Sequence, residues 1–165
     1  MDDEQFERLY LASRARLVGQ VYVMTGDMAE AQDCVQEAFA RAWPRRRTLD
    51  ADGAPEAWIR TTAWRLSVSR WRRAASGLRA HRRHGVQPDL PGPGVEHLDL
   101  ARALQSLNPD QRRAIVLHYL CDLSVEQVSA ETGAPASTVK TRLHRGRAAL
   151  AAVLAPATHL EVPRG

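Results

Sequence analysis

The chain has 165 residues, of which 44% are hydrophobic and 5% aromatic, and it carries a formal net charge of +4. This length and apolar content suffice for one ordinary core or two small ones, and the low aromatic content favours helices over sheet. The basic balance suits a polyanionic partner. No apolar run is long enough to span a membrane and no charged-then-apolar leader is present, so we expect a soluble, cytoplasmic protein without membrane insertion.

Cysteine and histidine spacing argues against metal and hydrolytic chemistry. Cys34 and Cys121 lack the paired spacing of a zinc site or a disulfide framework, so both are expected to be reduced core thiols. No HExxH motif, phosphate loop or nucleophile elbow appears, and the basic stretch that holds two of the histidines has no acid or cysteine cluster nearby. We therefore expect no enzyme, no cofactor and no metal. The histidines considered as ligands or bases are His81, His84, His97 and His118.

Apolar residues at helical spacing predict three helices in the first part of the chain. One opens at Asp2 or Asp3 and runs to residue 25; a second is capped by Asp27 and ends at Pro44; a third runs over 55–75. Between the last two, residues 44–55 contain turn formers, three consecutive arginines and no periodicity. We expect a loop there, and loops of that length are uncommon without a function.

Two surfaces of these helices have two interpretations each. Asp33, Gln36 and Glu37 form an acidic and amide patch on the second helix, for which ordinary solvation is the simple explanation. The third helix has a second apolar stripe on the side opposite its core face. That stripe either packs against another helix or offers indole rings to unpaired bases or to a protein surface. Its members are Trp64, Val68 and Trp71.

A segment rich in Gly and Pro and basic at its start predicts a flexible linker that divides the chain into two small helical domains. The fold class is therefore all-α. In the second domain, an apolar helix precedes one that starts at Asn108 and Pro109 and is expected to place Ile115, Val116, Tyr119 and Leu120 in the core. The predicted divisions are a helical domain at 1–75, a linker at 76–95, a second domain at 96–155 and a frayed tail at 156–165.

Residues 123–150 predict a helix-turn-helix. Ser124 and Gln127 form a capping box, and Gly133 followed by Pro135 stops the first helix. The second helix opens at Ala136 or Ser137. Its predicted inward stripe is Val139, Leu143, Gly146, Leu150 and Val153.

The opposite face of that second helix carries base-reading side chains, and its flanks carry arginines placed to reach phosphates. A basic, solvated face is the alternative explanation, but the cap, the glycine turn and the recognition face together favour DNA binding. Ser137, Thr141, His144 and Arg145 face outward, with Lys140 near one edge and Arg142 and Arg147 on the flanks. The candidate DNA-binding residues of this helix are Ser137, Thr138, Lys140, Thr141, Arg142, His144, Arg145 and Arg147.

In combination, the stretches 26–43, 58–73 and 107–150 resemble the extracytoplasmic-function sigma factors, the small bacterial RNA polymerase sigma subunits that retain only regions two and four. The resemblance covers nearly the whole chain. It implies a region 2 domain at 1–75 and a region 4 helix-turn-helix domain at 96–155. It also implies that core RNA polymerase and promoter DNA are the partners, and it leaves an anti-sigma factor open as a further one.

The resemblance assigns roles to the surfaces described above. Asp33, Gln36 and Glu37 would dock on the clamp helices of the largest polymerase subunit, and region 4 on the flap of the second-largest. The loop at 44–57 would capture a flipped base of the minus-ten element, and the recognition helix would read the minus-thirty-five element. The two domains would be held by polymerase and not by each other. The residues implied at the minus-ten element are Arg45, Arg46, Arg47, Trp64, Arg65, Trp71 and Arg72.

Three positions depart from the family pattern. Arg65 and Ser69 stand where Asn and Asp are common, and Ser129 replaces the usual small alanine of the helix-turn-helix. Two other classes stay open on the residues alone. A stand-alone helix-turn-helix regulator would bind duplex promoter without polymerase. Capture of a partner in a pull-down free of metal and DNA would favour an interaction-only adaptor.

Overall fold

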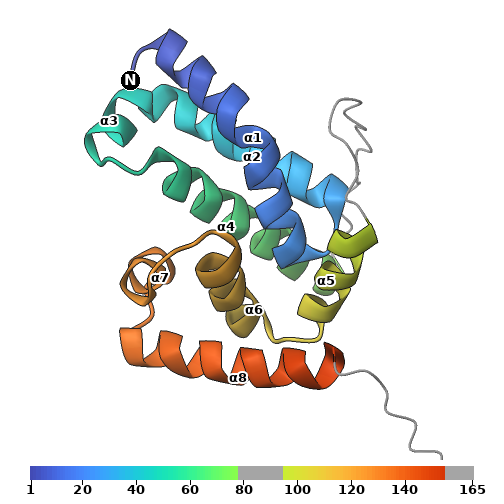
Figure 1. The fold of residues 1–165 in the computed structure, drawn as a ribbon. Helices are drawn as coiled ribbons and strands as arrows, with labels where there is room; N and C mark the ends of the chain where they lie inside the picture. The colour runs from blue at the N-terminus through green and yellow to red at the C-terminus, as the bar shows by residue number, and fades with distance from the viewer. Residues whose placement is uncertain (78–94, 155–165) are drawn as a thin grey trace, which may run out of the picture.

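The computed structural model describes residues 1–77 and 95–154, which are joined into one helical body (Figure 1). No strand occurs in these two ranges. The predicted tail, most of the predicted linker, and His81 and His84 lie outside the described residues. The elements are α1 (Asp3–Thr25), α2 (Met28–Ala42), the 3-10 turn η1 (Trp43–Arg45), α3 (Arg46–Ala51), α4 (Pro55–Ala75), α5 (Val95–Gln105), α6 (Pro109–Ile115), the π-helical turn η2 (Val116–Leu120), α7 (Val125–Thr132) and α8 (Ala136–Leu154).

The predicted helix boundaries that depend on local capping are confirmed. The Asp27 carboxylate accepts a hydrogen bond from the Glu30 amide at 3.0 Å, which satisfies one of the free donors at the start of α2. Ser124 and Gln127 form the reciprocal capping box of α7. Gly133 ends α7 in the left-handed conformation, with φ of 75°.

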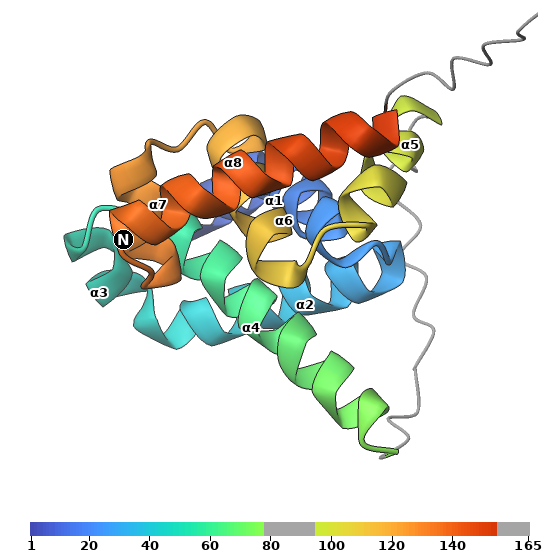
Figure 2. The ribbon, with the colours of Figure 1, turned by 90° about the horizontal axis from the view of Figure 1, so that it is seen from below.

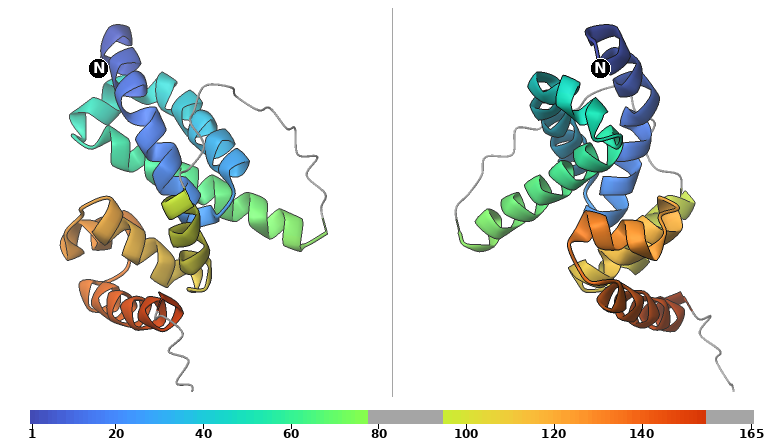
Figure 3. Two further views of the ribbon diagram at one scale, coloured as in Figure 1. Left: turned by 45° about the vertical axis from the view of Figure 1, so that its right-hand side comes forward. Right: turned by 90° about the vertical axis from the view of Figure 1, so that its left-hand side faces the viewer.

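The first half of the described chain, residues 1–77, is built from α1, α2 and α4, which pack against one another. Short apolar residues let α2 approach both neighbours closely, and Ala31, Ala38 and Ala42 are fully buried. Larger side chains fill the remaining space, among them Leu17 and Ile59. The C-terminal part of α4 extends beyond this bundle (Figures 2 and 3).

The second half, residues 95–154, packs α8 against α6 and α7, so that α8 forms the outer edge of the molecule (Figures 1 and 2). Gly146 is required where α8 crosses α6, because a β-carbon at this position would lie 2.8 Å from Ile115 Cγ1. The predicted inward stripe is confirmed for Val139, Leu143 and Gly146. It fails at Val153, which is 51% exposed.

The prediction of a loop at residues 44–55 is wrong for most of its length. The chain continues through η1 into α3, anchored by Leu49, which is 5% exposed. Thr48 Oγ1 donates to the Arg45 carbonyl at 2.8 Å, and Arg46 donates to the Trp43 carbonyl at 2.9 Å. These local bonds support short helical turns that are too brief to show a period in the sequence.

The expected core positions of Tyr119 and Leu120 are also wrong, since they are 52% and 44% exposed. The helix that starts at Pro109 widens into η2, where the Cys121 amide donates to the Val116 carbonyl, five residues back, at 3.0 Å. A π-helical turn holds one extra residue, so it rotates the side chains that follow away from the face that 3.6-residue spacing predicts. Ile115 and Val116, which precede the widening, are buried as predicted.

The two halves are in direct contact with each other in the chain alone, whereas the resemblance describes how polymerase holds them at a promoter. Helices α5 and α6 and the turn η2 contact α1, and α7 contacts α4. Figure 3 shows the second half lying beneath the first in both views. The contacts include buried polar groups, such as Arg60 of α4, that sequence periodicity cannot pair over this separation.

Candidate nucleic-acid interface

The turn between α7 and α8 is fixed by its own side chains. Ser129 Oγ donates to the Ala134 carbonyl at 2.6 Å, and Thr132 Oγ1 accepts from the Ala134 amide at 3.3 Å. The Gly133 amide closes the end of α7 on the Ser129 carbonyl at 2.9 Å. Ser129 therefore gives the turn a hydrogen bond that an alanine lacks, and α8 is held at a defined angle to α7.

Helix α8 presents a polar face to solvent, opposite its buried stripe. Thr138 is partly exposed and Thr141 donates to the Ser137 carbonyl at 3.1 Å. Within the described part of the chain, Lys140, His144 and Arg145 have no internal hydrogen bond or ion pair. Their side chains are therefore available for an external acceptor. The exposed polar residues of this face are Ser137, Lys140, Thr141, His144, Arg145 and Arg147.

The two flanking arginines of α8 are already engaged. Arg142 lies 3.5 Å from Asp110 Oδ2 and its side chain is 27% exposed. Arg147 donates to the Tyr119 hydroxyl at 2.7 Å. Both stay at the rim of the face, but Arg142 must leave a carboxylate before it can reach a phosphate.

A hollow of about 560 Å³ lies between α4 and α6 and contains four guanidinium groups without a carboxylate in its lining. Arg113 of α6 closes one side, with its guanidinium 5.3 Å from the centre of the Trp64 ring. Burial lowers the pKa of Arg113 to about 10, so it remains charged at neutral pH. The lining residues are Trp64, Arg65, Val68, Ser69, Arg72, Arg73, Ser76 and Arg113.

The structure separates the second apolar stripe of α4 into two parts. Trp64 and Val68 line the hollow, whereas Trp71 does not line it and is 69% exposed. Arg65 and Arg72, which the resemblance places at the minus-ten element, lie beside Trp64. Sequence reasoning missed Arg113 as a member of this cluster, because its place there depends on how the halves pack.

The three consecutive arginines after α2 are not equivalent. Arg46 is held by Asp3 Oδ1 at 2.7 Å and stacks on the Trp43 ring at 4.2 Å. Arg45 and Arg47 are exposed, and Arg45 lies 6.0 Å from the Trp58 ring centre. Two of the three are thus open to a phosphate.

The acidic and amide patch lies on α2, whose other faces pack against α1 and α4. Gln36 is exposed, and Asp33 and Glu37 are partly exposed. Glu37 accepts a hydrogen bond from Arg41 at 2.8 Å, one turn further along. This surface pair contributes little to stability, so Glu37 can exchange Arg41 for a basic group of a partner.

Metal ligands, histidine, cysteine and membrane-spanning helices were the other features that the described residues could have contributed to a site. Within 1–77 and 95–154, no three His, Cys, Asp or Glu side chains gather in a way that could hold a metal ion. His118 Nδ1 lies 2.7 Å from the Leu123 carbonyl, and both cysteines are free thiols. None of the helices in these ranges has the length and apolar character needed to cross a membrane.

Each half of the chain matches a model of a sigma-70 region. Residues 9–77 match sigma-70 region 2, and residues 97–150 match sigma-70 region 4. Together the two matches cover about three-quarters of the chain, so the chain belongs to the sigma-70 family.

Similarity to individual proteins identifies the type of sigma factor within this family. The chain is 29% identical to the ECF RNA polymerase sigma factor SigW of Bacillus subtilis (strain 168), over 90% of this chain and 88% of that protein. It is an RNA polymerase sigma factor of the extracytoplasmic-function type.

Solved structures share the fold across both halves. The sigma factor RpoE in complex with the anti-sigma factor NepR from Bartonella quintana superposes with a TM-score of 0.74, at 23% identity over 92% of this chain and 97% of that chain. CnrH in complex with the cytosolic domain of CnrY superposes with a TM-score of 0.66, at 23% identity over 93% of this chain and 89% of that chain.

Proposed function

We propose that this chain, acting in the cytoplasm, directs core RNA polymerase to promoters through two DNA contacts. Residues 1–75 act as region 2 and residues 96–155 as region 4, joined by the linker at 76–95. The observation that carries the proposal is the presence of a complete helix-turn-helix and a separate arginine-lined hollow with an indole wall in one chain. The chain contributes binding and strand opening, without covalent chemistry, cofactor or metal.

The outward face of α8 reads the minus-thirty-five element in the major groove. Arg145 and His144 are exposed and have no polar partner among the described residues, so they are the main base-reading side chains. Ser137, Thr138 and Thr141 contribute shorter contacts near the start of the helix. Lys140, Arg142 and Arg147 contact phosphates, which sets affinity and its dependence on salt.

The surface around α3 and α4 binds the minus-ten element. Arg45, Arg46 and Arg47 precede α4, and Arg65 and Arg72 lie on it. We assign these charges to the phosphates of one strand. Trp64 and Trp71 supply ring faces on which unpaired bases stack, and stacking stabilises an opened strand by about 1–3 kcal/mol per base. Arg46 contributes less than its neighbours because it is bonded to Asp3.

Polymerase docks on the patch formed by Asp33, Gln36 and Glu37, which receives the clamp helices of the largest subunit. Region 4 contacts the flap of the second-largest subunit. An anti-sigma factor is a further proposed partner. It is supported by the two solved relatives of the same fold, RpoE and CnrH, each of which was solved in complex with its own partner, NepR and the cytosolic domain of CnrY.

Run-off transcription with purified core polymerase tests the proposal most directly. The chain should support initiation from a subset of promoters that core alone does not use. If it binds duplex promoter as well without polymerase as with it, and stimulates no transcription, the chain acts instead as a stand-alone regulator.

The docking patch is tested by reversing its charge. Asp33→Arg combined with Glu37→Arg should abolish co-purification with core polymerase and leave folding intact, because both side chains are partly exposed. Glu7→Arg combined with Asp52→Arg is the matched control, since it reverses two exposed acids elsewhere in the first half. A folded patch variant that co-purifies as well as this control would disprove the docking assignment.

A further inference from the structure

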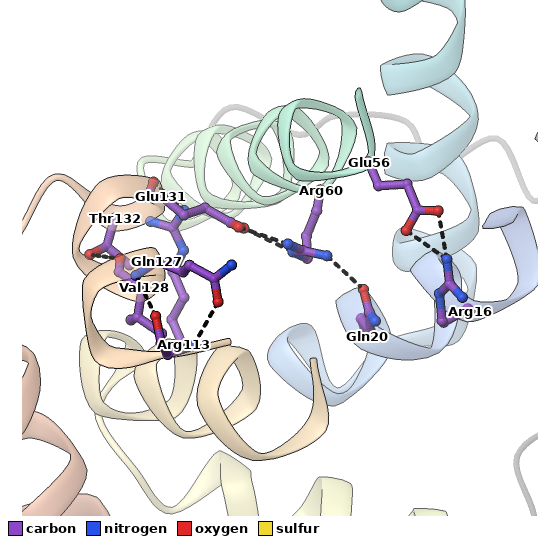
Figure 4. A network of polar contacts seen from close by, with 10 residues as sticks. Arg16, Gln20, Glu56, Arg60, Arg113, Gln127, Val128, Glu131 and Thr132 are labelled. Carbon is purple, nitrogen blue, oxygen red and sulfur yellow. Dashed lines mark hydrogen bonds and ion pairs between the residues drawn. The ribbon is translucent and has the colours of Figure 1, made fainter. Parts of the chain in front are cut away.

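One buried ion pair joins the two halves of the molecule. Arg60 of α4 donates two hydrogen bonds to the Glu131 carboxylate of α7, at 2.9 and 2.7 Å. The two side chains are only 7% and 6% exposed. Figure 4 shows the pair bridging the two helices, with Gln20 of α1 on the other side of the guanidinium. Arg60 Nη1 donates to Gln20 Oε1 at 3.3 Å, so three helices meet at this one side chain.

The pair is sensitive to loss of either partner. Burial alone would lower the pKa of Arg60, but the hydrogen bond and the charge of Glu131 outweigh it and raise that pKa. Arg60 therefore remains charged. If Glu131 is replaced by a neutral residue, the guanidinium is left in a buried site with only neutral partners, which is unfavourable unless the halves separate and admit water.

Other contacts align the same two halves. Arg112 of α6 donates to the Met24 carbonyl near the end of α1 at 2.8 Å. Gly26, with φ of 75°, faces Gln105 of α5 so closely that a β-carbon would lie 2.8 Å from the Gln105 Cδ. Arg113 covers one face of the Trp64 ring. The halves are thus docked at defined positions.

This closed arrangement is incompatible with binding both promoter elements at once. Elements centred about 25 base pairs apart are separated by roughly 85 Å along the duplex, at about 3.4 Å per base pair. A compact chain of this size has a radius of gyration of about 15 Å and a diameter of roughly 40 Å. The closed form cannot reach between the two elements, and it also places Arg113 over a ring that we assign to unpaired bases.

We propose that the Arg60–Glu131 pair is a latch that keeps the free protein closed, so that polymerase and promoter must open it before both halves can bind. The proposal rests on the proposed function, which requires the halves to act apart. A protein whose competent form is a minor population binds with an affinity reduced by that fraction. The latch therefore lowers the affinity of the free chain for polymerase and suppresses binding of DNA in its absence.

The test compares variants by two independent measurements on the full chain. Small-angle X-ray scattering gives the radius of gyration, and titration of purified core polymerase gives the dissociation constant. Glu131→Gln and Arg60→Gln should each expand the protein and tighten core binding by about tenfold or more, as expected if the open form is at most a tenth of the wild-type population. Glu126→Gln, which neutralises an exposed acid on the same helix α7, should behave as wild type.

A double variant separates the latch from damage to the helices. Arg60→Met with Glu131→Met replaces both charges by apolar side chains of similar length, and such replacements of buried pairs are well tolerated. It should stay compact and bind core as weakly as wild type. Expansion of the single variants then results from the unpaired buried charge.

Three results would overturn the latch: single variants as compact as wild type, single variants that expand without tighter core binding, or single variants that lose helical circular dichroism. The last would mean that the pair holds α7 folded, not the halves together. Failure of the proposed function has a different signature, because wild type and every variant would then fail to bind core polymerase while the scattering comparison would still report whether the pair closes the molecule.

Discussion

Replacing Arg145 by alanine should change which upstream promoter sequences the holoenzyme selects. Arg145 is exposed on α8, without a polar partner among the described residues, so its removal costs the fold little. A lost base-edge hydrogen bond weakens binding to the preferred element by about 1–3 kcal/mol, or roughly 5- to 150-fold, and relaxes selection at that base pair. His144→Ala should act in the same direction with a smaller effect.

Arg142→Ala should fail in a different way. Arg142 is paired with Asp110 at 3.5 Å, and the Asp110 side chain is 70% exposed, so the pair contributes at most about 1 kcal/mol to stability. Loss of the phosphate contact should weaken binding to all duplexes equally and reduce the salt slope by about one. Asp110→Asn is the opposing control: it releases Arg142 and should strengthen binding to every sequence.

The assay is holoenzyme binding to a library randomised at the upstream element, sequenced after selection at two salt concentrations. One experiment thereby distinguishes residues that contact bases from residues that contact phosphates, because only substitutions of the former change the selected sequence. An unchanged sequence preference for Arg145→Ala, or an altered one for Arg142→Ala, would refute the division of roles along α8.

Three further predictions follow from particular contacts. Trp71→Ala should slow open-complex formation on promoter DNA without weakening closed-complex recruitment, because Trp71 is 69% exposed and stacking is worth about 1–3 kcal/mol; loss of folding in a thermal melt would show it to be core. Ser129→Ala should lower the free energy of unfolding by about 1 kcal/mol in urea, through loss of the bond to the Ala134 carbonyl, and equal stability would count against that bond. Burial raises the pKa of the Cys34 thiol to about 12, so the native state keeps the proton after the unfolded thiol, near 9, has lost it. The free energy of unfolding therefore keeps the full contribution of the buried thiol below about pH 9 and loses it as the pH rises towards 12. Urea unfolding at pH 8 and 10.5 should show a smaller decline for Cys34→Ala than for wild type, and equal declines would contradict this.

Sequence reasoning succeeded where the determining contacts are local. The cap at Asp27, the box at Ser124 and Gln127, and the glycine stop at Gly133 act over three or four residues, so they can be read from neighbouring letters. The outward position of Arg145 also follows from helical rotation alone. These features define the helix-turn-helix and most helix bounds.

It failed where the structure depends on distant partners or on a change of helical pitch. Leu49 anchors a helix too short to show a period, and a widened turn exposes Tyr119. Arg60 and Glu131 are 71 positions apart, and neither differs in the sequence from an ordinary exposed charge. Their pairing depends on how the halves pack, so no local pattern could predict it.

The widened turn η2 also affects a side chain of α8. Because it rotates Tyr119 outward, the phenol meets α8 and accepts a hydrogen bond from Arg147 at 2.7 Å. Immobilising a free side chain at an interface costs about 0.5–1.5 kcal/mol of rotamer entropy. Tyr119 restricts Arg147 before any DNA arrives, so part of that entropy is already lost when the protein folds. One inserted residue in a helical turn thus preorganises a guanidinium 28 positions further along the chain.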